Sequence, residues 1–148
     1  MIKPMQVKTF YQLSHDELFS ILKTRVAVFV VEQACAYQEI DEVDRAADTH
    51  HVFLIEQGEV QAYARCYKPQ STISAIGRVL VSPDCRGKGV AQTLMARAIE
   101  ACHAHYGPQP IKIAAQTYLT QFYQSLGFVP CGQAYLEDGI EHIDMILR

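Results

Sequence analysis

The sequence has no tryptophan, no paired cysteine motif and no long apolar run. Its five cysteines are an odd number, lie far apart and never form C-x-x-C, which argues against a zinc knuckle or a disulfide framework. No run approaches the roughly 20 apolar residues that span a bilayer, and the N-terminal MIKPMQVKTFYQ lacks the apolar core of a signal peptide. We therefore expect a cytoplasmic protein with no metal site and no membrane partner.

The chain also lacks an excess of charge of either sign. Its 13 basic and 16 acidic residues give a formal net charge of −3. Without a global basic field, nucleic acid is excluded as a main partner, and any anion site must be local. With 148 residues, of which 49% are hydrophobic, the chain can bury one core, so we expect one domain over residues 1–148.

The apolar periodicity predicts a mixture of helices and strands. Ser14 and Glu17 form a capping box ahead of an apolar pattern, which predicts a helix to about Phe29. The acidic segment 32–51 favours an irregular loop with one short helical turn. The remaining pattern predicts strands at 51–56, 60–67, 73–82, 111–115, 128–136 and 140–147, and helices at 90–107 and 119–126. This order indicates an α/β (α+β) protein with a largely antiparallel sheet flanked by helices.

One strand runs into a glycine-rich turn, VLVSPDCRGKGVA, and a helical pattern follows at once. A strand that ends in glycines before a helix presents backbone N–H groups at the positive end of the helix dipole, which is an anion site. Gly87 and Gly89 allow close approach of the anion, and Arg86 and Lys88 add positive charge. The turn therefore predicts a phosphate site.

Three phosphate-binding motifs compete for this turn. A P-loop requires Ser or Thr after its lysine, but Lys88 is followed by Gly89, and the dinucleotide fingerprint requires three glycines in a βαβ unit. Both readings fail. The pattern Arg-x-x-Gly-x-Ala over residues 86–91 instead resembles the pyrophosphate loop of the GNAT superfamily of acetyl-coenzyme A dependent N-acetyltransferases.

A second segment, QTYLTQFYQSLGF at residues 116–128, resembles the other GNAT motif, a helix that carries a tyrosine and ends in Leu-Gly-Phe. Tyr123 occupies the tyrosine position, and Gln116 stands where asparagine is usual. The segments RVAVFVVEQACAYQEIDEVDRAADTHH and YLEDGIEHIDMIL resemble the ElaA family of bacterial GNAT proteins. The resemblance implies the GNAT fold, a single mixed sheet with a V-shaped opening between its central strands.

The resemblance also implies where acetyl-coenzyme A binds. Residues of the strand before the turn would pair with the pantetheine arm, and a backbone N–H near a bulge of that strand would polarise the thioester carbonyl. Tyr123 would be the general acid for the coenzyme A sulfur. The cofactor-binding residues implied are Val79, Leu80, Val81, Arg86, Gly87, Lys88, Gly89, Val90, Ala91, Gln116 and Tyr123.

The general base is open among several acidic and imidazole groups, because an amine with a pKa near 10 must lose a proton at neutral pH. The candidates are Glu32, Asp41, Asp44, His50, His51, Glu137, Asp138 and His142. We take His51 as the first choice, since it begins a strand after the acidic loop. Glu32, Glu137 and His142 are expected to bind the acceptor.

The resemblance therefore implies an N-acetyltransferase that moves an acetyl group from acetyl-coenzyme A to a primary amine by direct attack in a ternary complex. The acidic loop favours a cationic acceptor, either a polyamine-like small molecule or an amine of a peptide or protein. The alternative is a module that binds coenzyme A without catalysis, which the altered Gln116 position favours. An edge strand offers a surface for a homodimer.

Overall fold

The computed structural model describes residues 4–148, so the first three residues of the N-terminal segment lie outside it. Its strands form one eight-stranded sheet in the order β1-β2-β3-β4-β5-β8-β6, with β7 also paired to β8. The pair β4–β5 is parallel, and the other six pairs are antiparallel. The strands are β1 (Gln6–Lys8), β2 (His50–Glu56), β3 (Glu59–Gln70), β4 (Ile73–Val81), β5 (Ile111–Gln116), β6 (Val129–Pro130), β7 (Tyr135–Glu137) and β8 (Ile140–Leu147).

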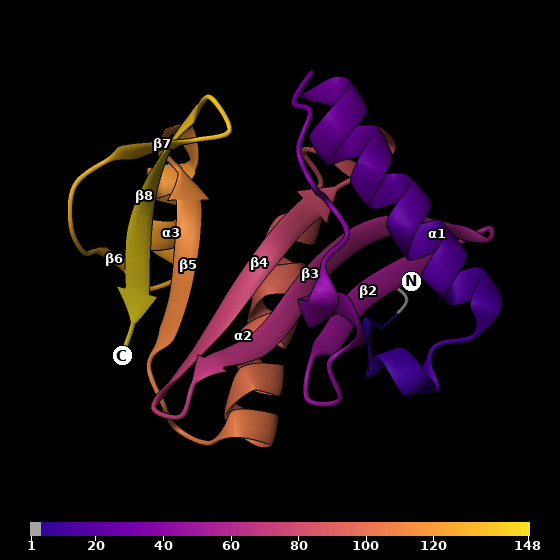
Figure 1. The fold of residues 1–148 in the computed structure, drawn as a ribbon, viewed down its shortest axis with the longest axis horizontal. Helices are drawn as coiled ribbons and strands as arrows, with labels where there is room; N and C mark the ends of the chain where they lie inside the picture. Colours follow the sequence, from indigo (N-terminus) through magenta and orange to yellow (C-terminus); the bar gives the residue numbers. More distant parts are fainter. Residues whose placement is uncertain (1–3) are drawn as a thin grey trace.

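Helices cover both faces of this sheet. Figure 1 shows α1 (His15–Arg25) across one face and α2 (Val90–Tyr106) behind the central strands, with α3 (Thr120–Ser125) behind β5 and β8. The short helical segments are η1 (Phe10–Gln12), η2 (Val26–Glu32), η3 (Glu42–Arg45), η4 (Pro83–Cys85) and η5 (Thr117–Leu119). The strands β2, β3 and β4 are therefore buried from two sides, which explains their nearly continuous apolar character, whereas β5 alternates buried and exposed residues.

The first helix begins where the sequence predicts. The Ser14 hydroxyl accepts a hydrogen bond from the Glu17 backbone N–H at 3.0 Å, and the Glu17 carboxylate accepts one from the Ser14 N–H at 2.8 Å. The α-helix ends at Arg25, but the chain continues to wind as the wider π-helix η2 up to Glu32. The single helical turn predicted for the acidic loop is η3.

Two apolar cores lie on opposite sides of the sheet. The core under α2 contains Leu94 and Met95, and the core under α1 contains Ile21, Tyr63 and Leu80. Strand residues divide between the two cores by the alternation of side chains along each strand. The positions of β2, β3 and β4 are therefore fixed from both faces.

The central strands separate towards their carboxyl ends. Within residues 4–148, the register between β4 and β5 is limited to Ser74 opposite Ile111 and Ala75 opposite Lys112, both near the strand starts. Beyond these pairs the two strands diverge, as Figure 1 shows. The V-shaped opening predicted between the central strands is confirmed.

One predicted strand is wrong in its extent. Residues 128–136 were expected to form one strand, but they divide into β6 and β7. Pro130 has no N–H to donate to a ladder, and Gly132 has a φ of 98°, outside the β region. The chain therefore leaves β8 after Pro130 and returns to it at Tyr135.

Candidate active site

The glycine turn opens α2 with a backbone geometry that suits an anion. Gly87 and Gly89 both have a φ of 77°, and Gly89 is the N-cap of α2. No side chain caps this helix and its first turn carries no acidic residue, in contrast to α1. Its first N–H groups therefore stay available at the positive end of the dipole.

A cleft of about 370 Å³ lies over this turn. Its lining consists of the end of β4, the turn, the start of α2 and one residue of α3: Val81, Cys85, Arg86, Gly87, Gly89, Val90, Ala91, Gln92 and Phe122. A Cβ added at Gly87 would meet nothing within 4 Å, so the glycine is required by its backbone conformation and not by crowding. A residue with a Cβ would cost roughly 1–2 kcal/mol in that left-handed conformation.

Arg86, at the rim of this cleft, is paired with Glu32 from the end of η2. The two guanidinium nitrogens lie 2.7 and 2.9 Å from the Glu32 carboxylate oxygens, and Nε donates to the Val81 carbonyl at 2.9 Å. This hydrogen bond with Arg86 lowers the pKa of Glu32. A residue predicted to bind the donor and one predicted to bind the acceptor thus contact each other here.

A β-bulge interrupts β4 where it leaves β5. Along β3, Tyr63 pairs with Leu80 and Arg65 pairs with Gly77. One residue separates the two β3 positions, whereas Arg78 and Val79 separate the two on β4, so β4 carries an extra residue. Neither Arg78 nor Val79 has a register partner on the described part of β3 or β5. The two residues therefore lie outside the regular ladder at the point where β4 leaves β5.

Tyr123 lies in α3 with only 6% of its surface exposed. Its ring packs edge-on against Phe122 and Phe128, with ring centroids 5.1 and 6.1 Å away. Burial, with a smaller contribution from the nearby Tyr118, raises the pKa of Tyr123 to about 12. The hydroxyl therefore keeps its proton at neutral pH.

Gln116 and His142 are register partners at the carboxyl end of β5, so their side chains share one face of the sheet. The Gln116 amide nitrogen lies 3.4 Å from the Gln33 side-chain oxygen. His142 Nδ1 lies 2.8 Å from the Ile140 carbonyl, which can only accept, so Nδ1 carries the hydrogen and Nε2 is the basic nitrogen. Nε2 lies 3.9 Å from a Glu137 carboxylate oxygen.

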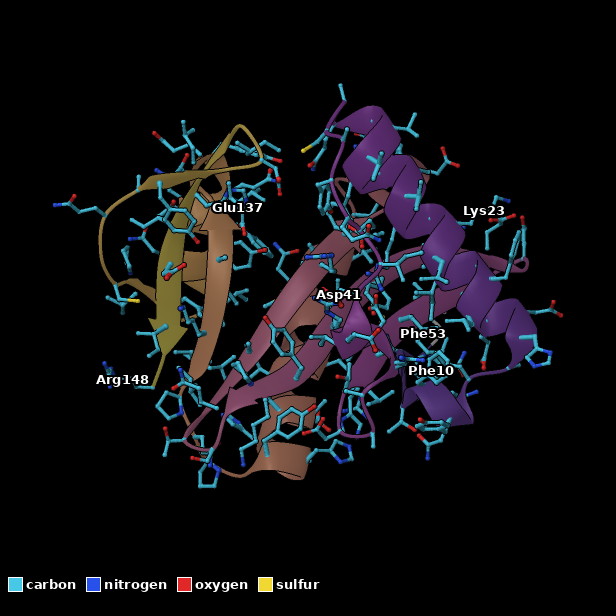
Figure 2. All side chains as sticks on the ribbon, viewed as in Figure 1. Phe10, Lys23, Asp41, Phe53, Glu137 and Arg148 are labelled. Carbon is cyan, nitrogen blue, oxygen red and sulfur yellow. The ribbon has the colours of Figure 1, made fainter. Side chains whose placement is uncertain are left out.

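The segment that follows η2 joins the two sides of the opening. Besides the Glu32 contact with Arg86 and the Gln33 contact with Gln116, the Cys35 thiol donates to the Asp138 carbonyl at 3.3 Å. Asp138 lies in the turn between β7 and β8. It follows Glu137, which Figure 2 labels at this end of the β7–β8 hairpin. The three residues predicted to bind the acceptor therefore lie along one connected rim.

His51, the predicted general base, lies elsewhere. It is 1% exposed, its Nε2 donates to the Asp44 carbonyl at 2.9 Å, and its Nδ1 accepts from the Tyr63 hydroxyl at 2.5 Å. Burial lowers the pKa of His51 to about 4. Because both ring nitrogens are engaged in the interior, no acceptor amine reaches them, and the assignment needs correction. His50 is likewise engaged, with the Tyr106 hydroxyl at 2.9 Å.

From the sequence alone the acidic loop favours a cationic acceptor, but much of its charge is paired within the protein. Three of its carboxylates pair with three arginines of α1, β3 and β4. The pairs are Glu39 with Arg25 and Arg78, Asp41 with Arg65 and Arg78, and Asp44 with Arg25 and Arg65. Burial opposes ionisation of Asp44, but the hydrogen bond and charge of Arg25, together with the Asp41 N–H and the charge of Arg65, outweigh it and lower the pKa to about 2. These carboxylates bind the protein's own cations, so Asp41 and Asp44 are not free bases.

Sequence reasoning missed these arginines, although a signal was present. Arg25 ends the helix just before the apolar run VAVFVV, and Arg78 interrupts a strand that is otherwise apolar. A charge at a position predicted to be buried requires a partner, and the acidic loop was the nearest source of carboxylates. Both arginines are found in the interior or at its edge, with side chains 0% and 23% exposed.

Other kinds of site find no support in the described residues. Across residues 4–148, no group of three or more His, Cys, Asp or Glu side chains is arranged to hold a metal ion. The same part of the chain contains no helix that is both long and apolar enough to cross a membrane. The five cysteines are free thiols.

Comparison with known proteins agrees with this arrangement. A profile of the acetyltransferase (GNAT) domain matches residues 12–148. Escherichia coli ElaA is 44% identical over 136 residues, which cover 90% of this chain and 89% of ElaA. The crystal structure of E. coli ElaA covers 99% of this chain and 100% of its own, with a TM-score of 0.94 and 41% identity. The crystal structure of an acyl-CoA N-acyltransferase from Pseudomonas aeruginosa covers 97% of this chain and 98% of its own, with a TM-score of 0.92 and 38% identity. The chain therefore belongs to the GNAT family and is an acyltransferase similar to ElaA.

Proposed function

We propose that this protein transfers an acetyl group from acetyl-coenzyme A to a primary amine by direct attack in a ternary complex. The observation that carries the proposal is the combination of an uncapped, glycine-entered helix and a bulged strand end at one opening of the sheet. The turn suits the pyrophosphate of coenzyme A. If the pantetheine arm runs from there along β4, its thioester end would lie near the bulge. Phosphate binding alone would not require the second feature.

The donor would lie along β4 and across the turn. Val79, Leu80 and Val81 offer backbone groups to the pantetheine arm, in the manner of a partner strand, because β5 has already diverged there. The pyrophosphate would accept hydrogen bonds from the turn at residues 86–91. Gln116 would contact the arm from β5, since its amide faces the residues that follow η2.

The acetyl group would then move in one addition and one elimination. The amine nitrogen attacks the thioester carbonyl carbon, and a backbone N–H of the bulge donates to the oxyanion that forms. The C–S bond breaks as the carbonyl re-forms, and the Tyr123 hydroxyl gives its proton to the departing thiolate. The proton lost by the amine passes to a base on the protein, so charge balances at the end of the cycle.

We assign the base to His142 in place of His51. Its Nδ1–H is held by a carbonyl, which leaves Nε2 basic, and it shares a face with Gln116 at the opening. Glu137, whose side chain is 56% exposed beside His142, would attract a cationic acceptor. Glu32 would contact the acceptor from the facing side of the rim once the donor phosphates compete for Arg86.

The direct test is detection of an acetylated product by mass spectrometry. The protein and acetyl-coenzyme A are incubated with polyamines, amino acids, aminoglycosides and lysine-containing peptides, and a reaction without protein measures spontaneous acetylation. Mass detection is needed because five free cysteines would react with a thiol dye. A catalysed product names the acceptor. Binding of acetyl-coenzyme A with no product in any pool would favour the alternative, a coenzyme A-binding module.

A further inference from the structure

The β4 bulge depends on a residue that does not favour its conformation. Arg78 has a φ of 53°, in the left-handed region where a residue with a Cβ is strained. Glycine is the residue that takes this conformation without cost at such a bulge. An arginine there must be held by its surroundings.

The side chain of Arg78 is hydrogen-bonded to one buried residue, Glu39, and its Nη2 also lies 3.6 Å from a carboxylate oxygen of the half-buried Asp41. Its Nε donates to Glu39 Oε2 at 2.9 Å, and Nη2 donates to the Glu39 carbonyl at 3.1 Å. The guanidinium carbon also lies 5.5 Å from the centre of the Tyr37 ring. Glu39 itself is 4% exposed, so its geometry is fixed by protein contacts and not by solvent.

Glu39 is in turn fixed by the interior. Arg25, which is 0% exposed, donates from Nε to Glu39 Oε2 at 2.7 Å and from Nη2 to the Glu39 carbonyl at 3.0 Å. The Tyr37 hydroxyl donates to the other carboxylate oxygen. Arg25 and Arg78 thus both donate to Glu39 Oε2 and to the Glu39 carbonyl. Glu39 therefore connects α1 to the bulge.

The bulge decides which way the end of β4 faces. Ile76 and Val79 both pack in the core under α2, whereas Leu80 packs in the core under α1. Residues three apart on a regular strand point to opposite faces, so Ile76 and Val79 share a face because of the extra residue. If the bulge relaxed, the backbone N–H groups beyond it would turn away from their present direction.

We propose that Glu39 is a positioning residue for acyl transfer: by holding Arg78 in its left-handed conformation, it aims the bulge N–H at the thioester carbonyl. The inference rests on the proposed function, because it assumes that a thioester lies along β4. Glu39 touches neither substrate in this scheme. Its effect passes through Arg78 and the backbone.

The first measurement compares Glu39→Gln and Arg78→Lys with Glu42→Gln. Glu42 belongs to the same acidic loop and has its own ion pair with Arg45, but that pair is exposed and does not contact the bulge. We expect kcat to fall at least about tenfold in the first two variants, with the Kd for acetyl-coenzyme A within about threefold of wild type. Glu42→Gln should match wild type. Arg78→Lys keeps the buried pair of Glu39 with Arg25. It therefore tests the contact between Arg78 and Glu39 even if Glu39→Gln folds poorly.

A glycine at position 78 separates positioning from other roles of Glu39. In Arg78→Gly the left-handed conformation does not need the contact with Glu39. Adding Glu39→Gln to this variant should therefore lower kcat by less than about a further threefold. A Glu39 that acted as a base, or bound the acceptor, would lower kcat by the same factor in both backgrounds. That additive result would overturn the proposal.

The infrared carbonyl band of bound 1-¹³C-acetyl-coenzyme A gives a readout that needs no acceptor. A donated hydrogen bond lowers the stretching frequency of the thioester carbonyl, so the band should shift on binding to wild type. We expect this shift to be lost in Glu39→Gln and to return in the double variant with Arg78→Gly. A shift retained in Glu39→Gln overturns the positioning role alone, whereas no binding of acetyl-coenzyme A to wild type overturns the proposed function with it.

Discussion

At the scale of single residues, Tyr123 combines a buried aromatic ring with a hydroxyl that stays protonated. Removing only the oxygen in Tyr123→Phe preserves the edge-on packing with Phe122 and Phe128, so the fold and donor binding should change little. We expect kcat to fall on the order of tenfold or more, because the thiolate would leave without its proton. Steady-state kinetics with a fixed acceptor measure the effect. Tyr11→Phe, at a tyrosine that is 74% exposed, is the control. Equal turnover in both variants would remove Tyr123 from the mechanism.

The assignment of His142 makes a separate prediction. His142→Ala removes the basic Nε2 and leaves a space beside Gln116, so kcat should fall on the order of 100-fold. Added imidazole should restore part of the activity, because a free base can enter that space. His15→Ala, at an exposed histidine, should show neither the loss nor the rescue. A rise in acceptor KM with no rescue would instead mean that His142 binds the acceptor.

Residues also differ in how far the sequence revealed them. The glycines and Tyr123 could be proposed as site residues from the sequence because each belongs to a short local pattern. His51 could not be assigned in that way, since its partners Tyr63 and Asp44 are brought to it by strand pairing and by the return of the acidic loop. The pairing of Arg78 with Glu39, 39 positions away, is similarly invisible to any local pattern.

At the scale of elements, the turn into α2 is the feature most open to a matched test. Gly89→Ala forces a Cβ into a φ of 77° at the N-cap, so the first N–H groups of α2 should lose their alignment. A cost of roughly 1–2 kcal/mol corresponds to an affinity for coenzyme A about 5- to 30-fold weaker. Calorimetric titration measures it directly.

Gly58→Ala provides the control for that variant. Gly58 also has a φ of 77° and open space around it, but it lies in the hairpin between β2 and β3. Both variants should lower the melting temperature, whereas the weaker coenzyme A binding should appear in Gly89→Ala alone. Equal affinities in the two variants would separate the turn from donor binding.

Elements differ in how well the sequence predicts them, for a physical reason. The capping box of α1 and the apolar periodicity of α2 each lie within one segment of the chain, and both helices begin where the sequence predicts. The division of the strand predicted over residues 128–136 follows from Pro130 and Gly132, whose unfavourable effect on strand pairing the sequence-based prediction ranked below the apolar character of their neighbours. The β4 bulge was expected from the family resemblance, but its position at Arg78 depends on the register with β3, which no single strand encodes.

At the scale of the whole molecule, the buried histidine predicts how stability varies with pH. The pKa of His51 is lowered from 6.5 to about 4, so unfolding takes up a proton between these values. Its contribution to stability is therefore complete above about pH 6.5 and is lost as the pH falls towards 4, by on the order of 3 kcal/mol. Asp44, with its pKa lowered to about 2, extends the loss from about pH 4 downwards.

Urea unfolding at a series of pH values measures this profile. His51→Gln should flatten the slope between pH 6.5 and 4, because the group that takes up the proton is gone. His103→Gln, at an exposed position late in α2, should leave the slope in place. A slope that is the same in wild type and His51→Gln would contradict the assignment of this transition to His51.

The divergence of β4 from β5 has a consequence for the lifetime of the protein. Within residues 4–148, two register pairs join β4 to β5, and the proposed donor would lie between the diverging strands as a temporary partner strand. A ligand that binds the folded state at 100 times its Kd adds about 2.7 kcal/mol of stability, which lowers the unfolded population roughly 100-fold. The supply of acetyl-coenzyme A would then govern not only how fast the enzyme works but also how long each copy escapes proteolysis.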